Sequence, residues 1–80
     1  IISAGVFTAF GRYDDAEQVL VEAIQRHPER ADLKLHLLDI YKHQNNREAF
    51  SALADVVEDD HADDEATQLE LSVLRRQYMA

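Results

Sequence analysis

Apolar residues along this 80-residue chain recur with the period of an α-helix, and no stretch alternates apolar and polar residues as a strand does. The stretch from about 14 to 27 illustrates the pattern, with apolar side chains at i, i+4, i+7 and i+8. The same pattern recurs elsewhere and predicts an all-α fold. Five helices are expected, at about 1–10, 14–27, 30–44, 47–58 and 64–79.

Four breaks separate the predicted helices. They are Gly11, Pro28, the pair Asn45-Asn46, and the acidic block 59–64. Glycine and asparagine tolerate left-handed backbone geometry, and proline cannot continue a helix. Because the links between helices are short, neighbouring helices should run antiparallel.

The helices repeat with a period of about 34 residues, which is typical of stacked helix pairs. Tyr41 follows Phe7 by that interval, and Asn45 follows Gly11. Two helix pairs are therefore in register, and the last stretch begins a third. The sequence predicts one segment of a larger protein. It would hold a first repeat truncated at its N-terminus (1–30), a degenerate second repeat (31–64) and a further, capping helix (65–80).

The first repeat resembles the tetratricopeptide repeat (TPR) family. The resemblance rests on a turn glycine, an aromatic residue, a small residue, a large apolar residue, an alanine and a closing proline at the family's spacing. These are Gly11, Tyr13, Ala16, Leu20, Ala23 and Pro28. It implies that antiparallel helix-turn-helix units stack into a right-handed α-solenoid.

The second repeat departs from that pattern. Phe50 stands where the first repeat has Ala16, and Ala54 stands where it has Leu20. The large and the small residue have exchanged places one turn apart, so the total side-chain volume is nearly unchanged. Cores tolerate such an exchange better than a net change of volume.

A narrower resemblance covers residues 9–41 and continues to Arg47, Ala49 and Phe50. This stretch is similar to the cytoplasmic repeat region of FimV-type polar hub proteins. That resemblance implies the cytoplasmic scaffold region of a bacterial inner-membrane protein at the cell pole. Such a protein would support type IV pilus assembly and twitching motility.

Charge and composition narrow the classes of partner. The chain has 16 acidic and 8 basic residues, a net charge of -8, and no cysteine. Nucleic acid is disfavoured because phosphate contacts come from Lys and Arg. Disulfides and thiolate zinc sites are excluded. No run approaches the roughly 18 apolar residues of a membrane span, so direct membrane contact by this segment is not expected.

Two arrangements of side chains are candidates for metal sites. On the helix at 30–44, the first candidate site would use His36, Asp39 and His43, which lie along one face over two turns and diverge too far to bind one zinc ion. Around the acidic block, the second would be a calcium-binding loop with ligands from Asp59, His61, Asp63 and Glu70. That loop would lack its central glycine, because Asp64 stands at this position. No metal, cofactor or catalytic residue is therefore expected, and no nucleophile motif suggests an enzyme.

The tetratricopeptide resemblance implies a concave face that binds a protein or peptide. The side chains expected there are Asp32, Leu35, His36, Asp39, Lys42 and His43, with Gly5 and Thr8 from the first helix and Glu70 and Val73 from the last. The basic residues with which some members grip a C-terminal carboxylate are absent from the matching positions. The alternative interpretation is a structural spacer or a self-association module, which would form a homo-oligomer.

Overall fold

A computed structural model of the chain describes residues 10–78, and within them it contains four α-helices and no strand. These are α2 (Tyr13–Arg26), α3 (Ala31–His43), α4 (Arg47–Asp60) and α5 (Glu65–Tyr78). The all-α prediction is confirmed. The predicted number of five helices is not matched, because residues 1–9 of the helix expected at 1–10 lie outside the described residues. The other predicted bounds differ from these helices by one or two residues.

Local chemistry explains where the helices begin. Gly11 and Asn45 both have a left-handed backbone, with φ of 73° and 55°, which redirects the chain before α2 and before α4. The side chain of Asn46 then caps α4 by accepting a hydrogen bond of 3.2 Å from the Ala49 amide. Asp64 caps α5 in the same way, accepting from the Thr67 amide at 3.2 Å and from the Thr67 hydroxyl at 2.7 Å.

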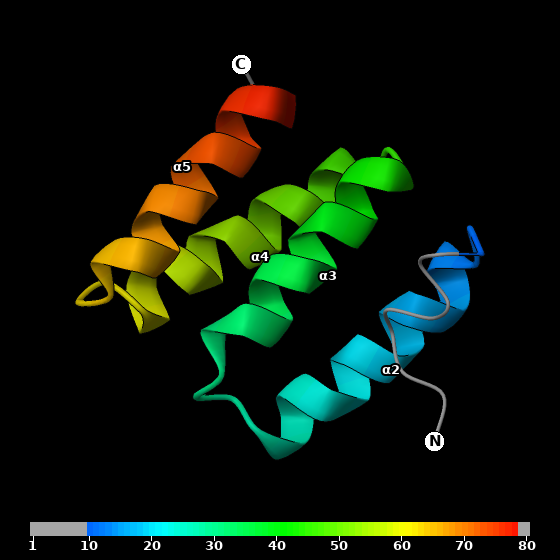
Figure 1. Cartoon of the computed structure of the whole chain (residues 1–80), viewed down its shortest axis with the longest axis horizontal. Coiled ribbons are helices and arrows are strands. Elements are labelled where there is room, and N and C mark those ends of the chain that lie inside the picture. Colours follow the sequence, from blue (N-terminus) through cyan, green and yellow to red (C-terminus); the bar gives the residue numbers. More distant parts are fainter. Residues whose placement is uncertain (1–9, 79–80) are drawn as a thin grey trace.

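Helix α3 lies at the centre of the arrangement (Figure 1). It packs against α2 on one side and against both α4 and α5 on the other, and α4 also packs against α5. Helix α4 has the bounds of α2 shifted by one sequence repeat, and α5 begins one repeat after α3. The period of the sequence is thus also the period of the structure.

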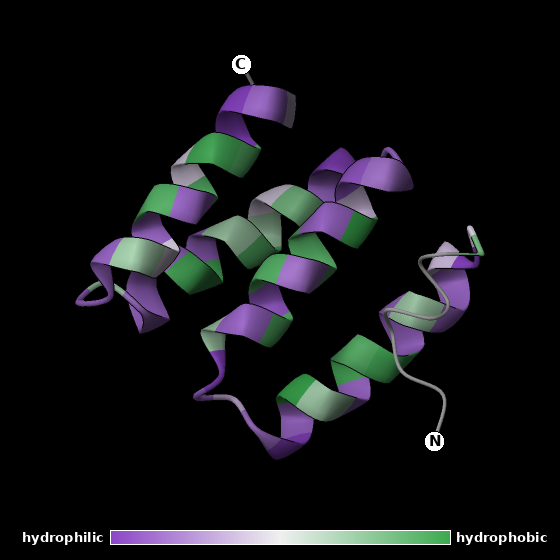
Figure 2. Cartoon of the chain, in the orientation of Figure 1, coloured by the Kyte–Doolittle hydropathy of each residue, from purple (hydrophilic) through white to green (hydrophobic). Residues whose placement is uncertain are grey.

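Two apolar clusters form the core, and Figure 2 shows hydrophobic and hydrophilic residues interspersed along each helix, as in amphipathic helices. The first joins α2 to α3 through Ala16, Leu20, Leu37 and Ile40. The second joins α3, α4 and α5 through Leu38, Phe50, Ala54, Val57 and Leu71. Tyr41 and Leu53 pack against both clusters and make the core continuous. Burial of this apolar surface is the main force that holds the helices together.

The exchanged residues of the two repeats all lie in this core. Ala16 and Phe50 are both 0% exposed, and Leu20 and Ala54 are 2% and 1% exposed. The chain therefore accommodates a large residue at either of two adjacent turns, provided that its neighbour is small. Within residues 10–78, no helix has both the length and the apolar character needed to cross a membrane.

Candidate functional site

A groove of about 440 Å³ runs between α3 and α5. Helix α3 contributes side chains at i, i+3, i+4 and i+7, and α5 contributes side chains at i, i+3 and i+4. This spacing places each set on one face of its helix. The lining residues are Asp32, Leu35, His36 and Asp39 from α3, and Glu70, Val73 and Leu74 from α5.

Six of the ten residues predicted for the concave face line this groove. Leu74 joins them from α5, although the sequence pattern did not indicate it. Gly5 and Thr8 lie outside the described residues. Lys42 and His43 lie on α3 beyond the groove, where both contact other side chains. The grouping is a feature of the structure, whereas a role in binding stays a prediction for each residue.

Apolar side chains form part of the groove wall. Leu35 and Leu74 are partly buried and pack against the second core cluster, which fixes their positions. Val73 is 40% exposed, so part of its apolar surface stays accessible. The groove thus offers apolar surface on a rigid base, which is the usual composition of a recognition site.

Three carboxylates line the same groove, and two of them already have cationic partners. Arg30 donates two hydrogen bonds to Asp32, of 3.2 and 2.6 Å, and these hold the pKa of the Asp32 carboxyl below its usual value. Asp39 lies 3.2 Å from the Lys42 ammonium. Glu70 is exposed and has no hydrogen-bond or ion-pair partner among residues 10–78.

Lys42 and His43 are used in holding the helices. Lys42 bridges α3 to α5 by donating to the Gln77 side chain at 3.2 Å. The His43 ring stacks on Tyr13 of α2, with centroids 5.0 Å apart and the planes 5° from parallel. These contacts give both residues structural partners at the ends of the helices, and they leave the groove lined by acidic and apolar groups together with His36.

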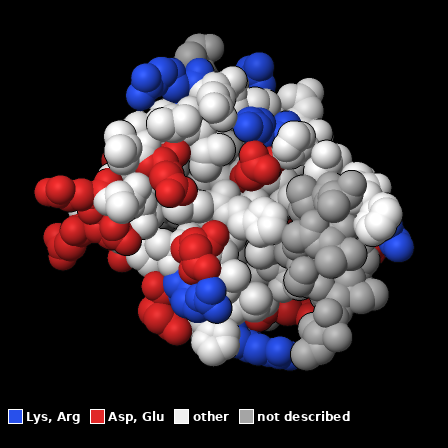
Figure 3. Space-filling model, viewed as in Figure 1, with Lys and Arg blue, Asp and Glu red and all other residues white. Residues whose placement is uncertain are grey.

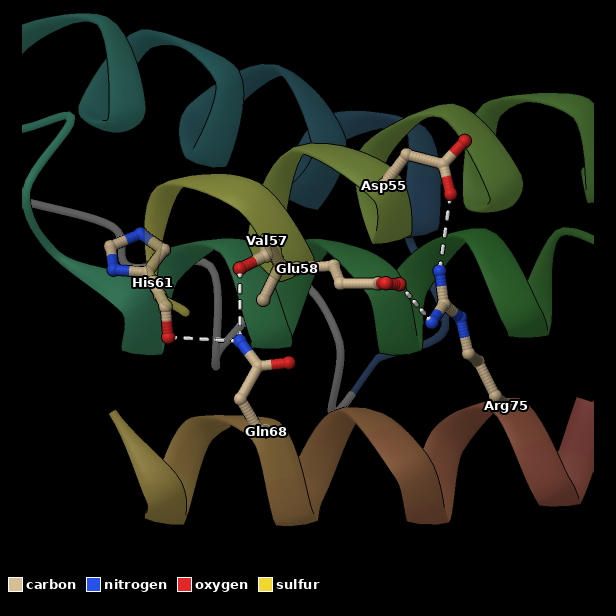
Figure 4. Close-up of polar contacts among 6 residues, drawn as sticks. All are labelled: Asp55, Val57, Glu58, His61, Gln68 and Arg75. Carbon is tan, nitrogen blue, oxygen red and sulfur yellow. Dashed lines mark hydrogen bonds and ion pairs between the residues drawn. The ribbon is translucent and has the colours of Figure 1, made fainter. Parts of the chain in front are cut away.

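Residues that the sequence pattern did not indicate hold α5 against α4. Figure 4 shows Gln68 donating from α5 to the carbonyls of Val57 and His61, at 3.1 and 2.9 Å, at the end of α4. In the same figure Arg75 reaches Glu58 at 2.6 Å and Asp55 at 3.2 Å. Both contacts fix α5 against α4, and α4 packs against α3.

Lys34 is the least expected of these residues. Its side chain is only 3% exposed, and its ammonium lies 3.0 Å from Nε2 of His61 and 3.6 Å from a carboxylate oxygen of Asp60. A buried ammonium requires such partners. Its position on α3 and its contacts at the end of α4 tie these two helices together.

Other hollows on the surface differ in chemistry. One of about 730 Å³ at the start of α2 is lined mostly by acidic and amide side chains, and one of about 850 Å³ surrounds the α4–α5 turn. Figure 3 shows acidic side chains gathered at that turn. Residues 10–78 contain no group of three or more His, Cys, Asp or Glu side chains placed to hold a metal ion. We therefore place the candidate site in the α3–α5 groove, where apolar and charged groups converge from two helices.

Comparisons with known proteins agree with the repeat architecture. The sequence profile of the tetratricopeptide repeat family matches residues 7–71. The chain is 38% identical over 48 residues, or 60% of its length, to the motility hub protein FimV of two strains of Pseudomonas aeruginosa, PAO1 and UCBPP-PA14. The match spans about 5% of the length of each of these relatives. No solved structure matches the chain significantly.

Proposed function

We propose, on the premise that this chain belongs to the tetratricopeptide repeat family, that it is a non-catalytic module that binds a segment of a partner protein in the α3–α5 groove. One observation carries this proposal. The groove presents Leu35, Val73 and Leu74 beside carboxylates, and the Val73 side chain is partly exposed. Apolar side chains on a rigid base supply contact area, and charged groups at the rim supply specificity.

We further propose that the module belongs to the cytoplasmic part of a polar hub protein that supports type IV pili and twitching motility. The support is the 38% identity to the motility hub protein of Pseudomonas aeruginosa. The acidic composition agrees with the notion of a scaffold region that does not bind nucleic acid.

A chimera tests this proposal. In the Pseudomonas aeruginosa hub protein, the matching stretch is replaced by this chain, and the twitching zone of the resulting strain is measured. We expect the chimera to restore motility. We expect Val73→Arg within it to abolish that restoration, because a guanidinium then occupies the apolar wall of the groove.

The matched control is Gln25→Arg on α2, which introduces the same side chain at an exposed position outside the groove. It should leave motility restored. Equal loss with both variants would count against the groove, and failure of the unmodified chimera at normal protein level would count against the hub assignment.

The spacer or self-association interpretation makes a different prediction. Leu69 on α5 is 65% exposed, and such a side chain favours contact with a second copy. The net charge of -8 opposes that contact, since two acidic copies repel each other. Light scattering from micromolar to millimolar concentration separates the two interpretations. A monomer throughout supports the groove proposal, and a mass that doubles and returns with Leu69→Gln supports self-association.

A further inference from the structure

We propose that the partner segment inserts a cationic side chain, arginine in preference to lysine, beside the apolar wall of the groove, and that Glu70 recognises it. This inference rests on the proposed function of the groove. It adds the chemical class of the partner and assigns the discrimination to one residue.

The side chains that line the groove carry an excess of negative charge. Three carboxylates line it, and no Lys or Arg does. Arg30 holds Asp32 through two hydrogen bonds, and Lys42 holds Asp39. Glu70 is the lining carboxylate for which residues 10–78 provide no counter-ion. An incoming cation therefore gains most at Glu70, where it displaces no existing partner.

The sequence of α5 explains why Glu70 has no counter-ion within its own helix. Partners within a helix stand three or four residues away. On the C-terminal side these are Val73 and Leu74, and on the N-terminal side Ala66 and Thr67, none of which carries a charge. The same spacing leaves the carboxylate bordered by apolar groups along the groove.

Two basic residues of α5 and α3, Arg75 and Lys42, are held by groups other than Glu70. Arg75 reaches away from the groove to Asp55 and Glu58 of α4 (Figure 4). Lys42 of α3 contacts Asp39 and Gln77. Both cations are thus held by other groups, and Glu70 has no ion-pair partner among residues 10–78.

The groove also fits the stem of a long cationic side chain. Such a side chain lays its methylene groups on apolar surface while its charged head stays at the rim. Val73 and Leu74 provide that surface directly after Glu70 on the same helix face. Arginine is preferred because its planar guanidinium meets a carboxylate through two parallel hydrogen bonds, which an ammonium cannot do.

A display selection tests the inference even while the partner is unidentified. A library of short random peptides is selected separately against the chain, against Glu70→Gln, against Glu70→Lys and against the control Glu22→Gln on α2. We expect the unmodified chain and the control to enrich peptides with arginine flanked by apolar residues. Peptides selected against Glu70→Gln should lack the arginine but retain the apolar residues. Selection against Glu70→Lys should enrich acidic peptides.

The outcomes separate the two proposals. If no peptide is enriched by the correctly folded chain, or if enriched peptides are unaffected by Val73→Arg, the binding function of the groove fails. Two other outcomes would show that the groove binds peptides but that the assignment to Glu70 is wrong. The enriched peptides could depend on Val73 but contain no arginine, or the peptides selected against Glu70→Gln could still contain arginine. Circular dichroism on each variant establishes that it is folded.

A double-mutant cycle then measures the contact itself. The best arginine peptide and its Arg→Gln version are each titrated against the chain and against Glu70→Gln by fluorescence anisotropy. We expect Glu70→Gln to weaken the arginine peptide by about twofold to fivefold, as the loss of an exposed charge pair does. The glutamine peptide should bind both proteins equally, and equal weakening of both peptides would overturn the proposed contact.

Discussion

The pairs α2–α3 and α4–α5 have the same backbone plan but different means of holding it. Helix α4 repeats the bounds of α2 one sequence repeat later, and a left-handed residue precedes each. The residues directly before the helices of the first pair are Arg12 and Arg30, and neither side chain caps its helix. The residues directly before the helices of the second pair are Asn46 and Asp64, and both side chains accept a hydrogen bond from an amide of the first turn.

This difference shows which part of the chain carries its own helix signals. In the second pair, a side chain close in sequence satisfies one of the first amides of each helix. In the first pair, no side-chain cap does so. We therefore expect the stability of the helices in the first pair to depend more on packing against neighbouring helices, although both pairs have the same backbone arrangement.

The two pairs also distribute side-chain volume in opposite ways. In α2 the small Ala16 precedes the large Leu20, and in α4 the large Phe50 precedes the small Ala54. The packing of the helices thus depends more on the combined side-chain volume at the two positions than on which of the two residues is large.

The largest expected effect comes from removing the large residue of the second pair. Phe50→Ala should lower the free energy of unfolding by about 3–5 kcal/mol, because it opens a cavity in a fully buried site. It also removes an edge-to-face contact with Tyr78, whose ring centroid is 4.9 Å away. Urea denaturation followed by circular dichroism measures the loss. A cost under about 1 kcal/mol would contradict the proposed core role of Phe50.

The next effect concerns the small residue of the first pair. Ala16→Leu should cost about 1–3 kcal/mol in the same measurement, because the added methylenes have no room where α2 meets α3. Gln18→Leu on the exposed side of α2 is the control and should change stability by no more than about 0.5 kcal/mol. Phe50→Leu should be milder than Ala16→Leu, since position 50 already holds a large side chain. Equal costs at positions 16 and 50 would mean that the two repeats are not in the register described.

A smaller effect tests the helix caps. Asn46→Ala removes the side-chain oxygen that accepts from the Ala49 amide and should cost about 1 kcal/mol. The counterpart in the first pair is Arg12→Ala, which removes no cap and should cost less. Thermal unfolding compares the two variants. A larger loss for Arg12→Ala would reverse the contrast between the pairs.

The smallest effect is a dependence on acid. The hydrogen bond from the Thr67 hydroxyl holds the pKa of Asp64 below its ordinary value of 3.8. Because the folded-state pKa is the lower one, the stabilisation is complete above pH 3.8 and is lost as the pH falls through the folded-state pKa. Melting temperatures of the chain and of Asp64→Asn should differ by a constant amount from pH 7 to about pH 5, and the difference should narrow as the pH falls below 3.8. A difference that does not narrow in acid would contradict the capping role.

Much of this architecture follows from local pattern. The helical period, the turn residues and the sequence repeat place four helices to within two residues, because each depends on side chains close in sequence. The groove was also partly predictable. Residues such as Asp32, Leu35 and Asp39 share a helix face by spacing alone.

The remaining features depend on contacts between distant residues. Lys34 suggests a solvated position in an amphipathic helix, yet the acidic end of α4, far along the chain, encloses its ammonium. Lys42 and His43 were expected on the binding face, but their partners Gln77 and Tyr13 lie on other helices. No local pattern specifies which side chain meets a partner from another helix. The distinction between the paired Asp32 and Asp39 and the unpartnered Glu70 is different, because it follows from residues close in sequence: Arg30 and Lys42 stand two and three residues from the first two carboxylates.

The buried Lys34 has a consequence for how the array assembles. Helix α4 ends in Glu58, Asp59 and Asp60 with no basic residue in its last turn, so its carboxylates repel the negative end of its own dipole. Lys34 from the preceding helix and Arg75 from the following one supply the missing positive charge. As an isolated peptide, α4 should fray at this end. Its last turn is therefore stabilised by both flanking helices, so we expect the unfolding of α4 to be coupled to that of α3 and α5.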